Sequence, residues 1–150
     1  MDDLRDLYQS TILDHNKKPR NFREISGVEH QADGHNPICG DKLRVFVELD
    51  GDRVTDAAFQ GSGCAISVAS ASLMTDAIKG CSLAEIEDQF KKFHDLVTTS
   101  AETPPDTPAL GKLAVFSGVR EFPMRVKCAT LAWHTLRAAL GEDNEVAKTE

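Results

Sequence analysis

The chain has 150 residues, a formal net charge of −7, and a composition that is 41% hydrophobic and 27% charged. This length predicts one domain with a core large enough to fold without disulfides. The negative charge argues against a nucleic-acid-binding protein that relies on phosphate contacts. No apolar stretch approaches the ~18 residues of a membrane span, and the acidic, amphipathic N-terminus is unlike a secretory signal peptide.

The chain carries four cysteines, at Cys39, Cys64, Cys81 and Cys128. Without an export signal we expect a cytoplasmic protein, and disulfides are rare in that reducing compartment. The four thiols are therefore expected to be free, to bind a metal or to take part in chemistry.

A helix and three strands are predicted in the first 60 residues. Residues 3–16 carry an apolar stripe at helical spacing, and residues 28–33 are predicted as a short edge strand. Residues 42–49 alternate between apolar and polar side chains, as a half-buried strand does. Asp50-Gly51 then indicates a two-residue hairpin turn that leads into a second strand at 52–60.

The hairpin predicts that two distant cysteines are neighbours. If residues 50 and 51 form the turn, residue 49 faces 52, residue 41 faces 60 and residue 39 lies near 62. The stretch GHNPICGD (34–41) then meets the loop GSGC (61–64) at one end of the hairpin. Cys39 and Cys64 are thus expected to lie close together although 25 residues separate them.

The second half of the chain is predicted to be mainly helical. The expected elements are helices at 64–80, 83–97, about 108–117 and 128–140, with a proline-rich loop at 98–108. Ser82 and Glu85 form a capping-box pattern at the start of the second of these helices. Cys64 and Cys128 are both expected at helix N-termini, where the helix dipole favours a thiolate over a thiol.

Three cysteines and one aspartate therefore form a candidate site. Cys39, Cys64, Cys128 and Asp41 would supply three sulfurs and a carboxylate, which suits tetrahedral zinc. The same set could hold an iron–sulfur cluster, because thiolates are its usual ligands. The alternative for each cysteine is a small buried apolar residue, and this is the interpretation we prefer for Cys81.

Other polar residues near the candidate site have weaker claims. His35 is a reserve ligand, four residues before Cys39. The remaining histidines are expected to be surface or partly buried residues and not ligands: His15, His30, His94 and His134. Arg125 and Lys127 flank Cys128, and a cation beside a thiolate lowers its pKa.

Three blocks of sequence resemble a known family. GHNPICGD, GSGCAISVASASLMTDAIKG and FPMRVKCATLAW closely resemble the U-type iron–sulfur assembly proteins (IscU and NifU N-terminal-like), and within them the SufU branch. The resemblance implies an α+β fold, with a small antiparallel sheet of about three strands carrying helices on one face. The match runs from the N-terminal helix to about residue 140, and we expect a single domain at 1–141, followed by a disordered tail at 142–150. The resemblance also implies that Cys39, Asp41, Cys64 and Cys128 bind the metal.

Two departures separate the chain from the IscU branch. IscU-like proteins have a histidine immediately before the third cysteine, where this chain has Lys127. They also have a shorter path between the second and third cysteines than the 64 residues that separate Cys64 from Cys128 here. Both departures favour the SufU branch.

The resemblance to the SufU branch implies a zinc-dependent sulfurtransferase. Such a protein accepts persulfide sulfur from a pyridoxal-phosphate-dependent cysteine desulfurase (SufS-like) and passes it to a downstream assembly complex (SufBCD-like). Cys39 is the expected sulfur acceptor, since its glycine-flanked loop is best able to move, and Arg125 is the expected supporting residue. The alternatives are a scaffold on which a [2Fe–2S] cluster is assembled and transferred, with iron at the same site, and a purely structural zinc-binding interaction domain.

Overall fold

A computed structural model describes residues 2–37, 39–99, 111–120, 122–141 and 147–148 of the chain. Along the chain the elements are α1 (Asp2–Lys17), β1 (His30–Asn36), β2 (Asp41–Asp50), β3 (Arg53–Ser62), α2 (Ala65–Ile78), α3 (Leu83–Thr98), the 3₁₀ helix η1 (Gly111–Val119), α5 (Pro123–Leu140) and β4 (Ala147–Lys148). The predicted α+β class is confirmed. Most of the predicted 98–108 loop lies outside the described residues.

The sheet has the strand order β3-β2-β1-β4. β1, β2 and β3 form an antiparallel meander, and the two residues of β4 pair in parallel with Gly34 and His35 of β1. β1 begins later and runs further than the predicted 28–33, ending at Asn36. The first three residues of GHNPICGD therefore belong to a strand and not to a loop.

The hairpin register differs from the predicted one. Asp50 pairs with Arg53, so Gly51 and Asp52 make the turn, with Gly51 at a φ of +64°. A bulge between Glu48 and Leu49 shifts the pairing by one further residue. Lys42 consequently faces Ser62, which brings residue 41 beside residue 63 and not beside residue 60. The stretches 34–41 and 61–64 still lie together, as predicted, and the shift in register brings Asp41 closer to Cys64.

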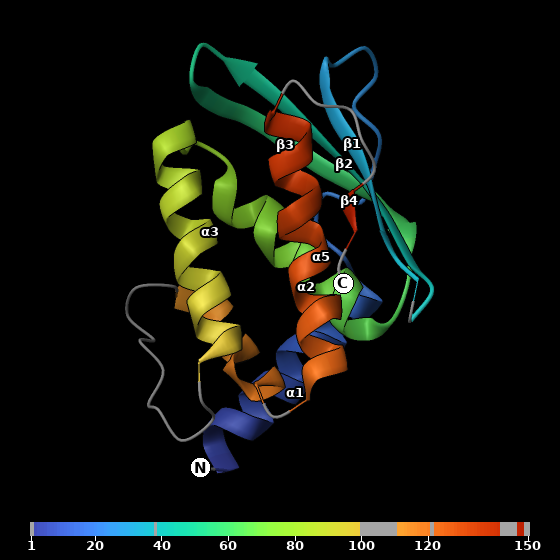
Figure 1. Cartoon of the computed structure of the whole chain (residues 1–150), viewed down its shortest axis with the longest axis vertical. Coiled ribbons are helices and arrows are strands. Elements are labelled where there is room, and N and C mark those ends of the chain that lie inside the picture. The colour runs from blue at the N-terminus through green and yellow to red at the C-terminus, as the bar shows by residue number, and fades with distance from the viewer. Residues whose placement is uncertain (1, 38, 100–110, 121, 142–146, 149–150) are drawn as a thin grey trace.

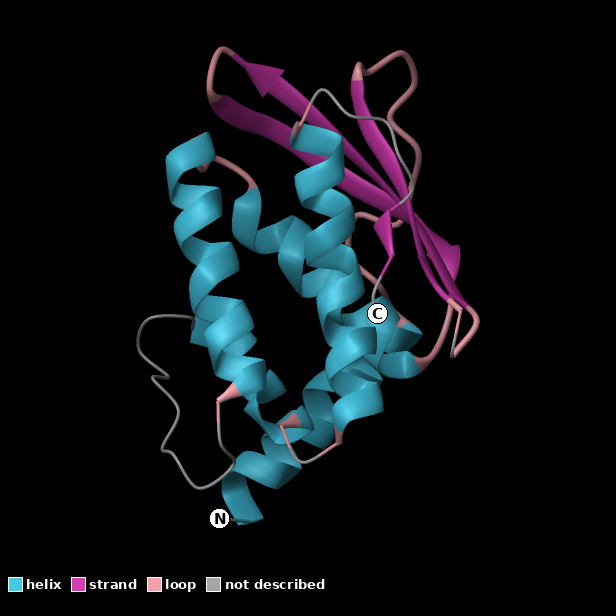
Figure 2. Cartoon of the chain, viewed as in Figure 1, coloured by secondary structure: helices cyan, strands magenta, loops and turns pink. Residues whose placement is uncertain are grey.

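The helices cover one face of the sheet, as Figures 1 and 2 show. α5 lies along β1 and β2, while α2 packs against β3 and α5. α1 contacts α2 and η1, and α3 packs against η1 and α5, on the side of α5 away from the sheet. None of the described helices combines the length and apolar character that crossing a membrane requires.

α2 is the central helix of the helical layer. All residues from Ser67 to Thr75 are buried, and many are alanine or serine, whose small side chains let neighbouring elements approach closely. The Ser70 hydroxyl donates to the Ala129 carbonyl of α5 at 2.6 Å. This hydrogen bond fixes α5 against α2 one residue beyond Cys128.

α5 begins earlier than predicted. The helix starts at Pro123 and not at residue 128, and proline suits the first helical position because the amide it lacks would have no helical partner there. Cys128 therefore lies in the second turn of α5. The prediction that Cys128 sits at a helix N-terminus was wrong. α3 carries the predicted capping box, in which Ser82 and Glu85 each bond the other's backbone amide.

Candidate metal centre

Three of the four predicted ligands lie in one compact group. The Sγ atoms of Cys39 and Cys128 and a carboxylate oxygen of Asp41 all lie within 4.8 Å of one another. The Cys128 thiol donates to the Cys39 sulfur at 3.4 Å. These side chains come from the turn after β1, the first residue of β2 and the second turn of α5. Strand pairing and helix packing thus bring together residues that are 89 positions apart.

Asp41 is the most completely enclosed member of the group. Its side chain is 0% exposed, and a buried carboxylate requires hydrogen bonds to offset the loss of water. Oδ1 accepts the Cys64 amide at 2.8 Å, and Oδ2 accepts the Asn36 side-chain amide at 3.2 Å. A Cβ atom at Gly63 would lie 2.5 Å from Oδ1. Glycine at this position allows the 63–64 backbone to approach the carboxylate.

Cys64 lies next to the compact group and is not part of it. It is the N-cap residue of α2, as predicted, and it is partly exposed. A hydrogen bond with the Cys128 thiol lowers the pKa of Cys64 to about 7, helped by the amides of Ser67 and Ile66 and opposed by burial. Cys64 thus ionises more readily than Cys128.

Cys128 and Cys39 differ sharply in exposure. Cys128 is 2% exposed, whereas Cys39 is an exposed residue on the turn before β2. Hydrogen bonding to Cys64, followed by burial, raises the pKa of the Cys128 thiol. In the metal-free protein Cys128 therefore acts as a proton donor to its neighbours.

These differences predict selective alkylation of the metal-free protein. Reaction of Cys64 with iodoacetamide should rise with pH around a midpoint near 7, because only the thiolate attacks. Cys128 should stay unmodified until the protein unfolds, since it is buried and its pKa is raised. Peptide mapping by mass spectrometry as a function of pH measures both, with exposed Cys39 as the accessibility reference. Equal rates for Cys64 and Cys128 would contradict this assignment.

The donor set fits a zinc ion. Two thiols and one carboxylate form a compact group, with the Cys64 thiol next to it, and the group is closed on the side of Asp41 and Cys128 and open at Cys39. Sulfur donors favour zinc or an iron–sulfur cluster over hard cations such as Mg²⁺ or Ca²⁺. Among the histidine, cysteine and acidic side chains of the described residues, those of Cys39, Asp41 and Cys128 lie close enough together to hold a metal.

Comparison with known proteins assigns the family. Residues 7–142 match the sequence model of the NifU-like N terminal domain. The chain belongs to this family. It is 41% identical over 140 residues to the zinc-dependent sulfurtransferase SufU of Bacillus subtilis strain 168, covering 93% of each chain. It is 39% identical over 137 residues to the iron-sulfur cluster assembly scaffold protein IscU of Streptococcus pyogenes serotype M1, covering 91% of this chain and 84% of the relative.

Solved structures agree with the assignment to the NifU-like family. A protein of the thermophile Fervidobacterium islandicum AW-1, described as a proposed iron-sulfur cluster assembly scaffold protein for the SUF system, is 33% identical and superposes with a TM-score of 0.81. The match covers 90% of this chain and 97% of that one. The resemblance inferred from the three sequence blocks is confirmed.

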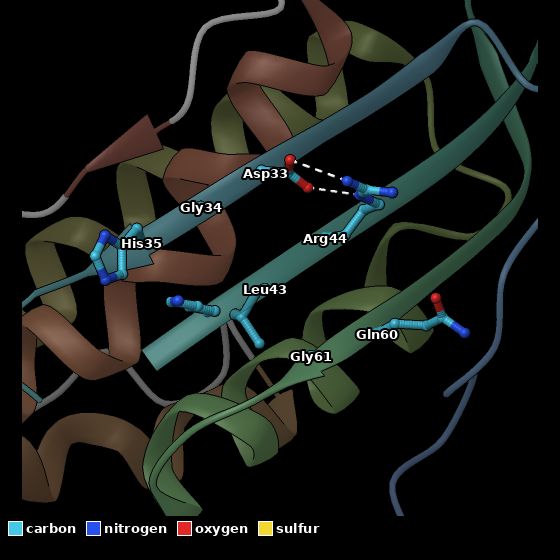
Figure 3. Close-up of a pocket in the computed structure, with 8 residues that line it drawn as sticks. Asp33, Gly34, His35, Leu43, Arg44, Gln60 and Gly61 are labelled. Atoms are coloured by element: carbon cyan, nitrogen blue, oxygen red, sulfur yellow. Dashed lines mark hydrogen bonds and ion pairs between the residues drawn. The ribbon is translucent and has the colours of Figure 1, made fainter. Parts of the chain in front are cut away.

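Two histidines lie where the sequence did not predict them. His35, the reserve ligand, lies on the outer face of the sheet, opposite to the face of its neighbour Asn36 (Figure 3). It lines a surface pocket of about 480 Å³ that also contains the ion pair of Arg44 with Asp33, at 2.6 Å. His15 is buried and not the surface or partly buried residue that was expected; its Nδ1 pairs with the Ser72 hydroxyl at 2.7 Å.

Arg125 and Cys81 lie outside the compact group. The Arg125 guanidinium lies over the exposed ring of Phe122, 4.3 Å from its centroid, at the start of α5. The Cys81 thiol donates to the Ala77 carbonyl and accepts from Gln89, both at 3.3 Å. Cys81 therefore joins α2 to α3 and has a structural role.

Asn36 is a site residue that the sequence analysis missed. It is buried at 0% exposure and contacts both Asp41 and Cys128. The available signal was its place in GHNPICGD. Once β1 is known to run to residue 36, strand pairing sets Asn36 opposite Asp41, on the same face of the sheet.

Proposed function

We propose that this chain is a zinc-dependent sulfur carrier for iron–sulfur cluster assembly, and that Cys39 accepts the sulfur. The observation that carries this assignment is the exposure of the thiols: Cys39 is exposed, Cys64 is partly covered and Cys128 is buried. A protein donor can reach Cys39 without disturbing the core. The similarity to a relative named a zinc-dependent sulfurtransferase supports the same assignment.

We assign the metal to Cys39, Asp41, Cys64 and Cys128. Bound zinc would keep its sulfur ligands as thiolates at neutral pH. The protein's contribution is to place the donors: Asp41 is held by the Cys64 amide, and Cys128 is held by α5. Cys39 lies on a turn next to Gly40, which has a φ of +73° and where an added Cβ atom would meet no described atom within 4 Å. Cys39 is thus the ligand with the most freedom to move.

The transfer is a thiol exchange at a sulfur–sulfur bond. The Cys39 thiolate attacks the terminal sulfur of a persulfide on a cysteine desulfurase. A bond forms between the Cys39 sulfur and that terminal sulfur, while the donor's sulfur–sulfur bond breaks and its electron pair leaves on the desulfurase cysteine as a thiolate. Cys39 then carries the persulfide. A second exchange of the same kind delivers the sulfur to an assembly complex, in a cytoplasm where thiols stay reduced.

Exposed residues at the start of α5 are suited to contact with the donor. Phe122 and Met124 are 43% and 54% exposed, and Arg125 lies over Phe122. We assign Arg125 a supporting role in holding the partner or the sulfur during transfer, because it is a cation on the helix that carries Cys128.

Single-turnover labelling tests the proposal. A desulfurase loaded with ³⁵S-persulfide should transfer label to the zinc-bound wild type, and Cys39→Ala should receive none. Cys81→Ala is the matched control, because it removes a partly buried thiol outside the site, and it should accept label like the wild type. Full uptake by Cys39→Ala would exclude Cys39 as the acceptor. No uptake by the wild type, with a [2Fe–2S] cluster formed from iron and sulfide, would favour the scaffold function.

A further inference from the structure

Asn36 occupies a position between two metal-ligand candidates. It is the last residue of β1 and pairs with Asp41 across the sheet. Its side-chain nitrogen donates to Asp41 Oδ2 at 3.2 Å and lies 3.6 Å from the Cys128 sulfur. An asparagine amide carries two N–H donors on one nitrogen, so one side chain can serve a carboxylate from β2 and a sulfur from α5.

The hydrogen-bonding groups of Asn36 are only partly satisfied. The side chain is 0% exposed, and its Oδ1 has no hydrogen-bond partner within the described residues. A buried polar atom without a partner destabilises a fold. An apolar residue at this position would remove that cost but would leave Asp41 Oδ2 without its donor. The donors of Asn36 therefore serve the two ligand candidates, Asp41 and Cys128.

We propose that Asn36 is a positioning residue for the metal centre, which holds Asp41 and Cys128 in place and leaves Cys39 free. Asp41 is fixed at both oxygens, by the Cys64 amide and by Asn36. Cys128 is fixed by α5 and by Asn36. Among the hydrogen bonds of the described residues, Cys39 joins this network only through its own sulfur, which accepts from the Cys128 thiol. The part of the inference that concerns Cys39 rests on the proposed function.

This arrangement divides the site into a fixed part and a movable part. The fixed part consists of Asp41, Cys64 and Cys128, joined through hydrogen bonds that include Asn36. Residues that orient metal ligands through hydrogen bonds typically account for about 10- to 100-fold of the metal affinity. If Asn36 orients the fixed part, its loss should weaken metal binding even where Cys39 is absent.

Asn36→Leu separates positioning from packing. The variant keeps the number and branching of side-chain heavy atoms and removes both donors, so we expect zinc affinity, measured by chelator competition, to fall about 10- to 100-fold. The metal-free variant should also lose some thermal stability, because buried Asp41 Oδ2 loses its donor, so zinc affinities are compared only between folded proteins. With Co²⁺ as the probe, the sulfur-to-cobalt absorption should weaken or shift. Thr135→Ala is the control. Thr135 lies over Gly34 at the same β1–α5 contact, and its hydroxyl donates to the Leu131 carbonyl of its own helix. This variant should lower stability and leave zinc affinity unchanged.

A double variant keeps this test apart from the sulfur-transfer test. Cys39→Ala alone should still bind Co²⁺ through the fixed part, and Asn36→Leu with Cys39→Ala should lose that binding. Neither measurement involves a desulfurase, so failure of sulfur transfer would not affect it. Zinc affinity within twofold of the wild type for Asn36→Leu, with an unchanged Co²⁺ spectrum, would overturn the proposal. If Asn36→Leu does not fold, Asn36→Ala gives the same comparison with a smaller side chain.

Discussion

Replacing Gly34 by valine is expected to destabilise the metal-free protein by about 3 kcal/mol or more, because it overpacks a closed contact. Gly34 lies in β1 beneath α5, where a Cβ atom would be 1.8 Å from Thr135 Oγ1 and 3.2 Å from Leu131 Cδ1. The helix would have to move away from the strand to admit the side chain. Because Asn36 is two residues further along the same face of β1, the metal ligands would be displaced with it.

Gly27→Val is the matched control for Gly34→Val. Gly27 has a φ of +78° and no described atom within 4 Å of a Cβ position, so valine there meets only the backbone strain of a left-handed conformation, about 1–2 kcal/mol. Urea unfolding of the two variants measures the difference. Thr135→Ala combined with Gly34→Val should recover part of the loss, since the closest clashing atom is then gone. Equal midpoints for the two glycine variants would show that the β1–α5 contact can adjust.

The elements that the sequence predicted are those with strong local signals. The alternation in residues 42–49, the capping box of α3 and the stop at Gly80 all lie within a few residues of the structure that they specify. The start of α5 was misplaced although Pro123 was a local signal for it. His15 was misjudged because its partner Ser72 is 57 residues away, and no local pattern reports such a contact.

The site was predicted in outline because the hairpin brings its parts together. Cys39, Asp41 and Cys64 follow from the pairing of β2 with β3, and the error in register came from the turn at Gly51-Asp52 and the bulge after Glu48. A bulge depends on how the strand curves over the core, and the residues around it do not predict that curvature. Cys128 was included because it was expected at a helix N-terminus, although the structure places it in the second turn of α5. Its partner Asn36, 92 residues away, was missed.

Zinc-dependent stabilisation should differ between two cysteine variants. Saturating zinc, at about 100 times its dissociation constant, adds about 2.7 kcal/mol to the stability of a protein that binds it only when folded. For a chain of this length, that corresponds to a rise in melting temperature of roughly 5–10 °C. We expect this rise in the wild type, a smaller one in Cys39→Ala, and none in Cys128→Ala.

The asymmetry follows from the position of each sulfur. Removing Cys39 takes an exposed turn residue away from a set in which Asp41, Cys64 and Cys128 remain. Removing Cys128 takes away the buried sulfur that contacts Cys39, Cys64 and Asn36, and it leaves a cavity beneath the site. Calorimetry with and without zinc, using Cys81→Ala as the control, measures the difference. Equal losses in Cys39→Ala and Cys128→Ala would mean that all the ligands support the fold alike, which is the behaviour of a structural zinc domain and not of a site with one ligand free to accept sulfur.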